Sequence, residues 1–297
     1  MRILLTGADG QLGRHLTPRL EVLGEVITST RRGGDWPCDL TETEALDDLL
    51  DGARPDVIIN PAAWTAVDAA EDEPAAAAAL NVELPTRLAA WCAAHGARLV
   101  HFSTDYVFDG EPGRAWNEFD PTSPVSVYGR TKLAGEEAIR RSGAHALILR
   151  TAWLYSRLPG NFLSAILRRA ASGEPLRVVS DQIGSPTWAG SLARMTVAAL
   201  GDCLPRPEPV TLHAVDRGCV SWHAFAELAV TMAAERGLID EVVPVAAIDS
   251  AEWPQKARRP SWSVLDVEAL EQCTGCTAWT TRQALATCLE EWKEEAC

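Results

Sequence analysis

The sequence lacks the features that mark membrane proteins and nucleic-acid-binding proteins. No uninterrupted apolar run approaches the ~20 residues that a transmembrane helix requires, and the run at residues 2–6 is too short for a signal peptide. Basic residues are outnumbered: 27 Lys and Arg stand against 41 Asp and Glu, for a formal net charge of −14. This charge repels phosphates, so it argues against non-specific binding to nucleic acid or anionic membranes. We therefore expect a soluble, cytoplasmic protein in which any anionic ligand needs a local basic pocket.

Cysteine is present, but without the spacing of a complete metal site. The eight cysteines are scattered through 297 residues, a chain long enough to fold on a hydrophobic core, so we expect reduced thiols. Cys273 and Cys276 form the one CxxC pair, with no second pair or histidine cluster to complete a zinc site. The sequence therefore predicts no metal, and we interpret the pair as ordinary small residues near a turn.

The composition is that of an ordinary globular protein, since 47% hydrophobic and 23% charged residues indicate no disordered or fibrous class. Short apolar runs alternate with amphipathic stretches in the first half, which is the pattern of repeated βα units around a parallel sheet. Beyond about residue 152 this pattern loosens. We predict an α/β fold with a doubly wound parallel sheet in residues 1–152 and a smaller second domain in residues 153–297. The predicted strands are 2–6, 25–30, 56–59, 97–102 and 145–150.

A glycine-rich loop follows the first predicted strand and opens a predicted helix. Gly7, Gly10 and Gly13 have the spacing GxxGxxG. In a dinucleotide-binding loop these positions allow a sharp turn, the approach of backbone amides to a pyrophosphate, and close packing of helix on sheet. Three glycines alone are a weak signal, and a structural turn is the alternative. Their place between a strand and a helix favours a nicotinamide dinucleotide.

The end of the second predicted strand bears on the choice between NADP and NAD. A ribose 2′-hydroxyl usually meets an acid there, whereas a 2′-phosphate prefers a cation. The stretch after the strand carries Arg31 and Arg32 and no acid, so NADP(H) is the expected cofactor, with NAD(H) as the alternative. Solvated surface arginines are the other interpretation. Farther on, Asp39 and Leu40 follow a short extended segment and are placed to contact the adenine.

Tyr128 and Lys132 lie at the start of a predicted helix, and their spacing puts both on one helical face, one turn apart. A tyrosine with an ordinary pKa near 10 is a reluctant proton donor and acceptor at neutral pH, and a nearby cation should lower that pKa. The spacing alone is often an exposed helix contact. Thr104 follows the fourth predicted strand, where ligands gather in parallel sheets, and can hydrogen-bond a carbonyl oxygen that gains negative charge. Capping a turn is its alternative role.

With these residues assembled, the chain resembles the extended short-chain dehydrogenase/reductase superfamily and, within it, the dTDP-4-dehydrorhamnose reductase family. The resemblance spans nearly the whole chain. Besides the glycine loop and the Tyr128/Lys132 pair, it rests on residues 60–68, 103–110, 150–155 and 181–187.

The resemblance implies an NADP-binding Rossmann domain with a smaller sugar-nucleotide domain interleaved with it, so that the chain returns to the first domain late in the sequence. It also implies that Asp105 and Trp153 contact the sugar, together with Thr104, and it makes Arg259 a candidate for the substrate's diphosphate. A solvated basic run is the alternative for Arg259. The implied cofactor contacts beyond the glycines are Gln11, Leu12, Asp39, Leu40, Ala62, Ala63 and Thr65.

Two positions qualify the resemblance. Family members that dimerise through a magnesium site use a glutamate on the first helix, and His15 stands at the matching position here. We therefore predict no such metal, and both a monomer and a homodimer stay open. Dehydratase relatives carry an Asp-Glu pair after the threonine, whereas this chain has Asp105-Tyr106.

These observations predict that NADPH reduces the 4-keto group of a dTDP-4-keto-6-deoxysugar while Tyr128 donates the proton. A sugar-nucleotide epimerase or dehydratase is one alternative. A second is a catalytically silent, NADP-binding regulatory subunit that resembles the methionine adenosyltransferase β subunit.

Overall fold

The computed structural model describes residues 1–111, 113–203 and 208–295. Its largest element is a six-stranded sheet in which every neighbouring pair is parallel, in the order β10-β5-β4-β3-β1-β2. The predicted α/β class and all five predicted strands are confirmed, with strand ends that differ by at most two residues. The six strands are β1 (Arg2–Thr6), β2 (Glu25–Ser29), β3 (Val57–Asn60), β4 (Arg98–Thr104), β5 (His145–Thr151) and β10 (Val210–His213).

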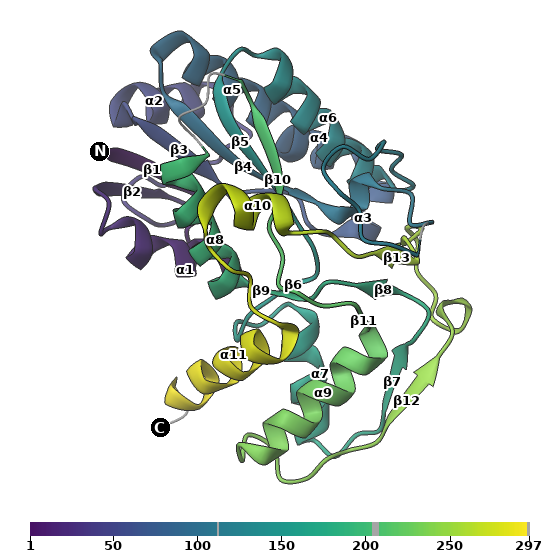
Figure 1. Ribbon diagram of the computed structural model, residues 1–297. Coiled ribbons are helices and arrows are strands. Elements are labelled where there is room, and N and C mark those ends of the chain that lie inside the picture. Colours follow the sequence, from purple (N-terminus) through teal and green to yellow (C-terminus); the bar gives the residue numbers. More distant parts are fainter. Residues whose placement is uncertain (112, 204–207, 296–297) are drawn as a thin grey trace.

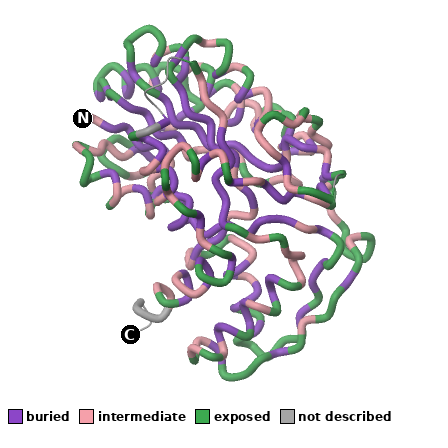
Figure 2. Tube along the Cα trace, viewed as in Figure 1, coloured by how far each residue is buried: buried purple, intermediate pink, exposed green. Residues whose placement is uncertain are grey.

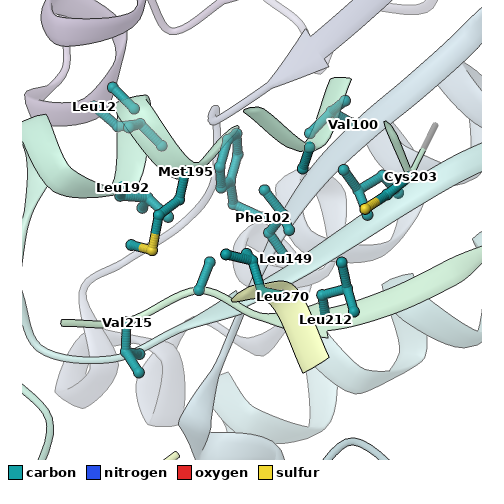
Figure 3. Close-up of a cluster of buried hydrophobic side chains, with 14 of the residues drawn as sticks. Leu12, Val100, Phe102, Leu149, Leu192, Met195, Cys203, Leu212, Val215 and Leu270 are labelled. Carbon is teal, nitrogen blue, oxygen red and sulfur yellow. The ribbon is translucent and has the colours of Figure 1, made fainter. Parts of the chain in front are cut away.

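Helices cover both faces of this sheet because its side chains alternate between two apolar clusters (Figure 1). In β1, Ile3 and Leu5 join the cluster beneath α1 (Gln11–Leu20), α8 (Ala189–Asp202) and α10 (Glu268–Thr274), while Leu4 joins the opposite cluster. Figure 3 shows the first cluster, with Leu12 of α1 and Leu192 of α8 among its members. The opposite face is covered by α2 (Thr43–Ala53), α5 (Leu84–His95) and α6 (Val127–Arg141).

Short elements connect β3 to α5 along the carboxyl edge of the sheet. They are α3 (Val67–Asp72), α4 (Pro74–Ala78) and one π-helical turn, η1 (Ala79–Glu83), that runs directly into α5. A π turn inside a helix often accompanies a functional site. Another short element, the 3₁₀ turn η2 (Asp105–Val107), follows β4 at the same edge.

A smaller lobe with its own apolar core lies below the sheet in Figure 1. It is built on α7 (Phe162–Ala171), α9 (Trp222–Glu235) and α11 (Thr281–Glu295), and Figure 2 shows buried positions along its helices as well as along the large sheet. Its strands are β6 (Leu154–Tyr155) paired with β9 (Thr187–Trp188), β7 (Leu176–Val179) paired with β12 (Val245–Ile248), and β8 (Ile183–Gly184) between β11 (Val220–Ser221) and β13 (Trp262–Ser263). The 3₁₀ turn η3 (Ser250–Glu252) follows β12.

The chain passes between the lobes several times. After α7 and β7 to β9 in the smaller lobe, α8 and β10 return to the large sheet, and β10 pairs with β5. Later, α10 also packs on that sheet before α11 joins the smaller lobe. The loops between the lobes therefore gather beside the carboxyl ends of the large sheet's strands.

The expectation of reduced thiols throughout is wrong, because Cys203 and Cys273 form a disulfide that joins the end of α8 to α10. Their positions lie 70 residues apart, so sequence spacing alone did not connect them. Cys276, the second member of the CxxC pair, is a free thiol whose Sγ accepts a hydrogen bond from Arg194 Nη1 at 2.8 Å. Within the part of the chain that the structure describes, no helix is both long and apolar enough to cross a membrane.

Candidate active site

A cavity of about 530 Å³ lies at the carboxyl ends of β1, β3, β4 and β5, where a doubly wound sheet binds its ligands. Its size is typical of a small-molecule site. Most predicted site residues line it: Gly7, Gly10, Gln11, Leu12, Gly13, Arg31, Asp39, Leu40, Ala62, Ala63, Thr65, Thr104, Asp105, Tyr128, Lys132 and Trp153. Arg32 and Arg259 are not among the lining residues. Thr30 and Thr151, at the ends of β2 and β5, also line the cavity and were missed.

The glycine loop leaves no room for a side chain at Gly13 and little at Gly7. Gly7 has a positive φ of 54°, and a Cβ on Gly13 would lie 2.3 Å from the Gly7 carbonyl oxygen. Gly10 is the N-cap of α1, where no side chain caps the helix and its first turn contains no acid. The amides of this first turn are therefore left for a ligand, in the arrangement that binds phosphate groups. This backbone cradle fits the pyrophosphate of a dinucleotide.

Asn81 fixes the loop that carries Ala62, Ala63 and Thr65 through two hydrogen bonds to its backbone. The Trp64 amide donates to Asn81 Oδ1 at 3.0 Å, and Asn81 Nδ2 donates back to the Trp64 carbonyl at 3.1 Å. Asn81 is buried in the π turn η1. Sequence reasoning missed this residue because a π turn has no recognisable side-chain periodicity.

The end of β2 places one of the two arginines at the cavity. Arg31 lines it with a side chain that is 67% exposed, and its Nε lies 3.5 Å from Asp39 Oδ2. The Asp39 pKa is lowered, first by hydrogen bonds from Thr41 and then by the Arg31 charge. Arg32 is exposed outside the cavity. One exposed guanidinium is therefore available to an anionic group at this end.

The start of α6 brings Tyr128 to the cavity. Ser126 caps the helix by accepting a hydrogen bond from the Gly129 amide at 3.1 Å. A Cβ on Gly129 would lie 2.2 Å from the Tyr106 carbonyl oxygen, so the glycine lets α6 pack closely on η2. Burial raises the pKa of the Tyr128 phenol, and a hydrogen bond with the Thr104 side chain partly opposes that increase. The phenol is therefore firmly protonated near neutral pH.

Lys132 is 2% exposed, and its Nζ donates a hydrogen bond to the Phe102 carbonyl oxygen at 2.6 Å. Burial lowers the pKa of Lys132 to about 8, while the Glu136 charge works in the opposite direction. The prediction that a nearby cation lowers the Tyr128 pKa is wrong, since that pKa is raised and Lys132 is not among its causes. The spacing of the two residues did not show how far their polar groups are removed from solvent, which is the largest cause of both pKa shifts.

Thr104 and Asp105 face the phenol from the end of β4. The Thr104 hydroxyl donates to Asp105 Oδ1 at 2.9 Å and accepts from the Tyr106 amide at 3.2 Å. Asp105 is 2% exposed, and burial raises its pKa to about 7 although several hydrogen bonds oppose the increase. A hydroxyl, a protonated phenol and a carboxyl group that titrates near neutral pH thus lie together, an arrangement suited to donating a proton to an oxygen atom.

Trp153 forms a wall of the cavity in a strained conformation, with a positive φ of 47°. Its ring stacks on Trp222 with centroids 3.5 Å apart and planes within 4° of parallel. On Gly184, a Cβ would lie 2.4 Å from the Trp153 ring. The ring is thus held by the smaller lobe, and no sequence signal indicated the part that Trp222 plays.

Arg259 lies in a second pocket of about 380 Å³, with Arg258, Gln182 and Trp253 among its lining residues. Its Nη2 lies 3.0 Å from Asp68 Oδ2, and its Nη1 donates to the Tyr106 hydroxyl at 3.3 Å. The Tyr106 ring meets the Tyr128 ring edge to face, with centroids 5.7 Å apart. Tyr106 therefore lies between Arg259 and the cavity.

Comparison with known proteins matches residues 1–294 to the RmlD substrate binding domain family. A dTDP-4-dehydrorhamnose reductase from Burkholderia thailandensis is 39% identical over 98% of this chain and 99% of its own length. A solved dTDP-4-dehydrorhamnose reductase from Clostridium acetobutylicum superposes with a TM-score of 0.89, at 35% identity, over 99% of this chain and 100% of the other.

A second solved dTDP-4-dehydrorhamnose reductase, from Bacillus anthracis in complex with NADP, has a TM-score of 0.87 and 29% identity over 98% of this chain and 99% of the other. The expected family resemblance is confirmed. The chain belongs to the RmlD substrate binding domain family, together with the dTDP-4-dehydrorhamnose reductases.

Proposed function

We propose that this protein is an NADPH-dependent reductase that converts the 4-keto group of a dTDP-4-keto-6-deoxysugar to a hydroxyl group. The observation that carries the proposal is the cavity itself, which brings Thr104, Tyr128 and Lys132 to the same space as the glycine loop. The reductases and the NADP complex among the relatives support the same substrate class and cofactor.

On the cofactor side, the proposal assigns pyrophosphate binding to the amides of the first turn of α1, because that turn has no side-chain cap. Lys132 would donate to a ribose hydroxyl with the hydrogen that its contacts with Phe102 and His101 leave free. Arg31 would bind the 2′-phosphate, which favours NADPH over NADH. When bound, NADPH supplies the hydride, and the protein supplies placement and electrostatics.

On the substrate side, Thr104 and Tyr128 would both hydrogen-bond the keto oxygen. Negative charge grows on this oxygen during reduction, and both donors stabilise it once the Thr104 hydroxyl turns its hydrogen from Asp105 to the keto oxygen. Tyr128 then transfers its phenolic proton to the oxygen, and its raised pKa means that the proton is present at the start of the reaction. We assign contacts with the sugar ring to Asp105 and Trp153, which line the same cavity.

Reduction is favoured over dehydration by the residue after Asp105. A dehydratase needs a second acid there to move protons, whereas the Tyr106 hydroxyl is occupied by Arg259 and its pKa is raised by burial. A silent regulatory subunit has no need of three polar groups gathered around one cavity.

The test follows NADPH oxidation with a panel of dTDP-4-keto-6-deoxysugars and repeats it with NADH. We expect turnover that is faster with NADPH, and a kcat roughly 10² to 10⁴-fold lower in Tyr128→Phe because the proton donor is removed. NADPH binding to that variant should be nearly unchanged. Tyr155→Phe is the matched control, since Tyr155 is a buried tyrosine of the smaller lobe whose hydroxyl has no hydrogen-bond partner among the described residues.

Three outcomes contradict the proposal. If wild-type protein binds NADPH but turns over none of the panel, the regulatory alternative gains support. If Tyr128→Phe retains the wild-type rate, another group donates the proton. Loss of water from the sugar without NADPH consumption would indicate a dehydratase instead.

A further inference from the structure

A buried polar chain leads from Lys132 away from the cavity and across the sheet. Lys132 Nζ lies 3.3 Å from His101 Nε2, and His101 Nδ1 lies 3.1 Å from Asn60 Nδ2. The next contact joins Asn60 Oδ1 to the Thr6 hydroxyl at 2.6 Å. His101, Asn60 and Thr6 are all 0% exposed. Burying three polar side chains in an apolar sheet is costly unless each is hydrogen-bonded, so their contacts with one another are needed to stabilise them.

The buried polar side chains follow the order of the strands in the sheet. His101 and Asn60 are register partners on β4 and β3, and Thr6 ends β1, the next strand. Rigid parallel strands therefore fix the imidazole relative to both the glycine loop and Lys132. The ammonium has two fixed neighbours on the sheet side, the Phe102 carbonyl and His101 Nε2.

An imidazole at this place holds the ammonium without neutralising it. Burial and the Lys132 charge both lower the pKa of His101 well below its ordinary value, so the ring stays uncharged. The acid nearest along α6, Glu136, is bound by Arg150 at 2.7 Å and Arg140 at 2.6 Å. A carboxylate in place of His101 would pair with the ammonium and cancel the charge that the cofactor side uses.

The two neighbours of the ring restrict its tautomer. A neutral imidazole has one acceptor nitrogen and one N–H donor. A charged Lys132 is only a donor, so Nε2 must accept and the ring proton must be on Nδ1. Asn60 is then the partner that adapts, because an asparagine side chain can turn Oδ1 toward Nδ1 and Nδ2 toward Thr6 in nearly the same shape.

We propose that His101 is the positioning residue of Lys132, and that it acts as the neutral Nδ1–H tautomer whose Nε2 accepts from the ammonium. This inference rests on the proposed reductase function, since it assigns His101 an effect on the cofactor only through Lys132. His101 itself does not line the cavity.

Two substitutions test the contacts of the two ring nitrogens of His101 separately. The amide of glutamine reaches the place of Nε2, so His101→Gln keeps an acceptor for Lys132. The shorter amide of asparagine reaches the place of Nδ1, so His101→Asn keeps the contact with Asn60 and leaves Lys132 without its acceptor. We expect kcat to fall roughly 10- to 100-fold in His101→Asn, because misplacing a group by about 1 Å has effects of this size.

NADPH should also bind more weakly to His101→Asn. In His101→Gln, kcat and the affinity for NADPH should both stay within about threefold of wild type. A residue with a merely structural role would not distinguish the two amides in this way. Equal losses in both variants, or full activity in His101→Asn with its fold verified by thermal unfolding, would overturn the proposal.

A second measurement needs no variant and no turnover. In full-length, ¹⁵N-labelled protein, the ring nitrogens of His101 should show a protonated Nδ1 and a bare Nε2 near neutral pH. An Nε2–H tautomer or a charged ring overturns the proposal even if His101→Asn does not fold. If wild type binds NADPH but reduces no substrate, the reductase function fails, while the tautomer and the NADPH affinities still decide the role of His101.

Discussion

The 530 Å³ cavity and the 380 Å³ pocket around Arg259 are built in different ways. In the cavity, the polar groups follow strands or begin helices, and Thr104, Asp105 and Lys132 are each 5% exposed or less. The pocket is lined by loop residues at 109–111 and 250–261, together with Gln182. The loop at 253–260 is tied to α3 by exposed or half-exposed charges, which include the Lys256–Asp72 and Arg259–Asp68 pairs.

In the proposed reductase, this difference separates the groups that carry out the reaction from the groups that bind the rest of the substrate. Groups that must be placed within a fraction of an ångström are supported by the rigid sheet, whereas groups that recognise the rest of a substrate lie on loops. Ion pairs with much exposed surface contribute little stability, so the loop can change its residues without disturbing the sheet. Changes to the reacting groups of the cavity should therefore lower kcat, and changes in the pocket should weaken substrate binding with the chemistry left intact.

Among changes that leave the reacting groups in place, the largest effect is expected from Gly13→Ala. The added Cβ would lie 2.3 Å from the Gly7 carbonyl oxygen and 2.6 Å from Ala8 Cα, so the backbone of the loop must move. Overpacking of this kind costs about 1–3 kcal/mol, and we expect NADPH affinity to fall by roughly 10- to 100-fold. Titration of NADPH fluorescence measures it. Gly201→Ala on α8, where a Cβ meets nothing within 4 Å, is the control. Unchanged NADPH binding in Gly13→Ala would contradict the assigned role of the loop.

A smaller effect, on KM alone, is expected from Arg259→Ala. If Arg259 binds the diphosphate of the substrate, its loss should raise KM for the sugar nucleotide about tenfold, because a hydrogen bond to a charged group contributes about 1.5–3 kcal/mol at most. The kcat should change little. Arg258→Ala, which removes an exposed arginine from the same pocket, is the matched control. A large loss of kcat would instead mean that Arg259 affects the reaction through Tyr106. The division between a cavity that carries out the reaction and a pocket that binds the substrate would then not hold.

Features that lie within one strand, helix or loop were predictable from the sequence, whereas features that depend on packing between elements were not. The strands, the glycine loop and the trio of Thr104, Tyr128 and Lys132 were predictable, because strand and helix periods determine where each side chain points within its own element. The stack of Trp153 on Trp222 was not, because it depends on how two lobes pack. The Cys203–Cys273 disulfide was not predictable either, because it depends on how α8 and α10 pack against each other on the large sheet.

The pKa values of the site were also out of reach. A phenol beside an ammonium has a lowered pKa in water, but burial dominates at Tyr128 and reverses the direction. Burial depends on every element that surrounds a residue, and the four-residue spacing of Tyr128 and Lys132 carries no information about it.

The smallest effect is expected from Asp105→Asn, and it tests the cavity's own electrostatics. Burial raises the pKa of this carboxyl group to about 7, so it is mainly protonated below that pH and ionised above it. The ionised form accepts hydrogen bonds from sugar hydroxyls more strongly than the protonated form. Wild-type KM for the sugar nucleotide should therefore fall severalfold as pH rises from about 6 to about 8, with a midpoint near the raised pKa.

Asp105→Asn removes the titrating group and keeps its shape, so its KM should be nearly independent of pH over the same interval. The substrate's diphosphate is fully ionised there, and Arg259→Ala should retain the wild-type pH dependence at a higher KM. If the inflection near pH 7 persists in Asp105→Asn, its origin lies in another group. A wild-type KM that rises with pH would mean that the protonated carboxyl group is the form that binds the sugar. The cavity would then recognise its substrate by donating hydrogen bonds, as Thr104 and Tyr128 are proposed to do, whereas the pocket around Arg259 would supply the charge.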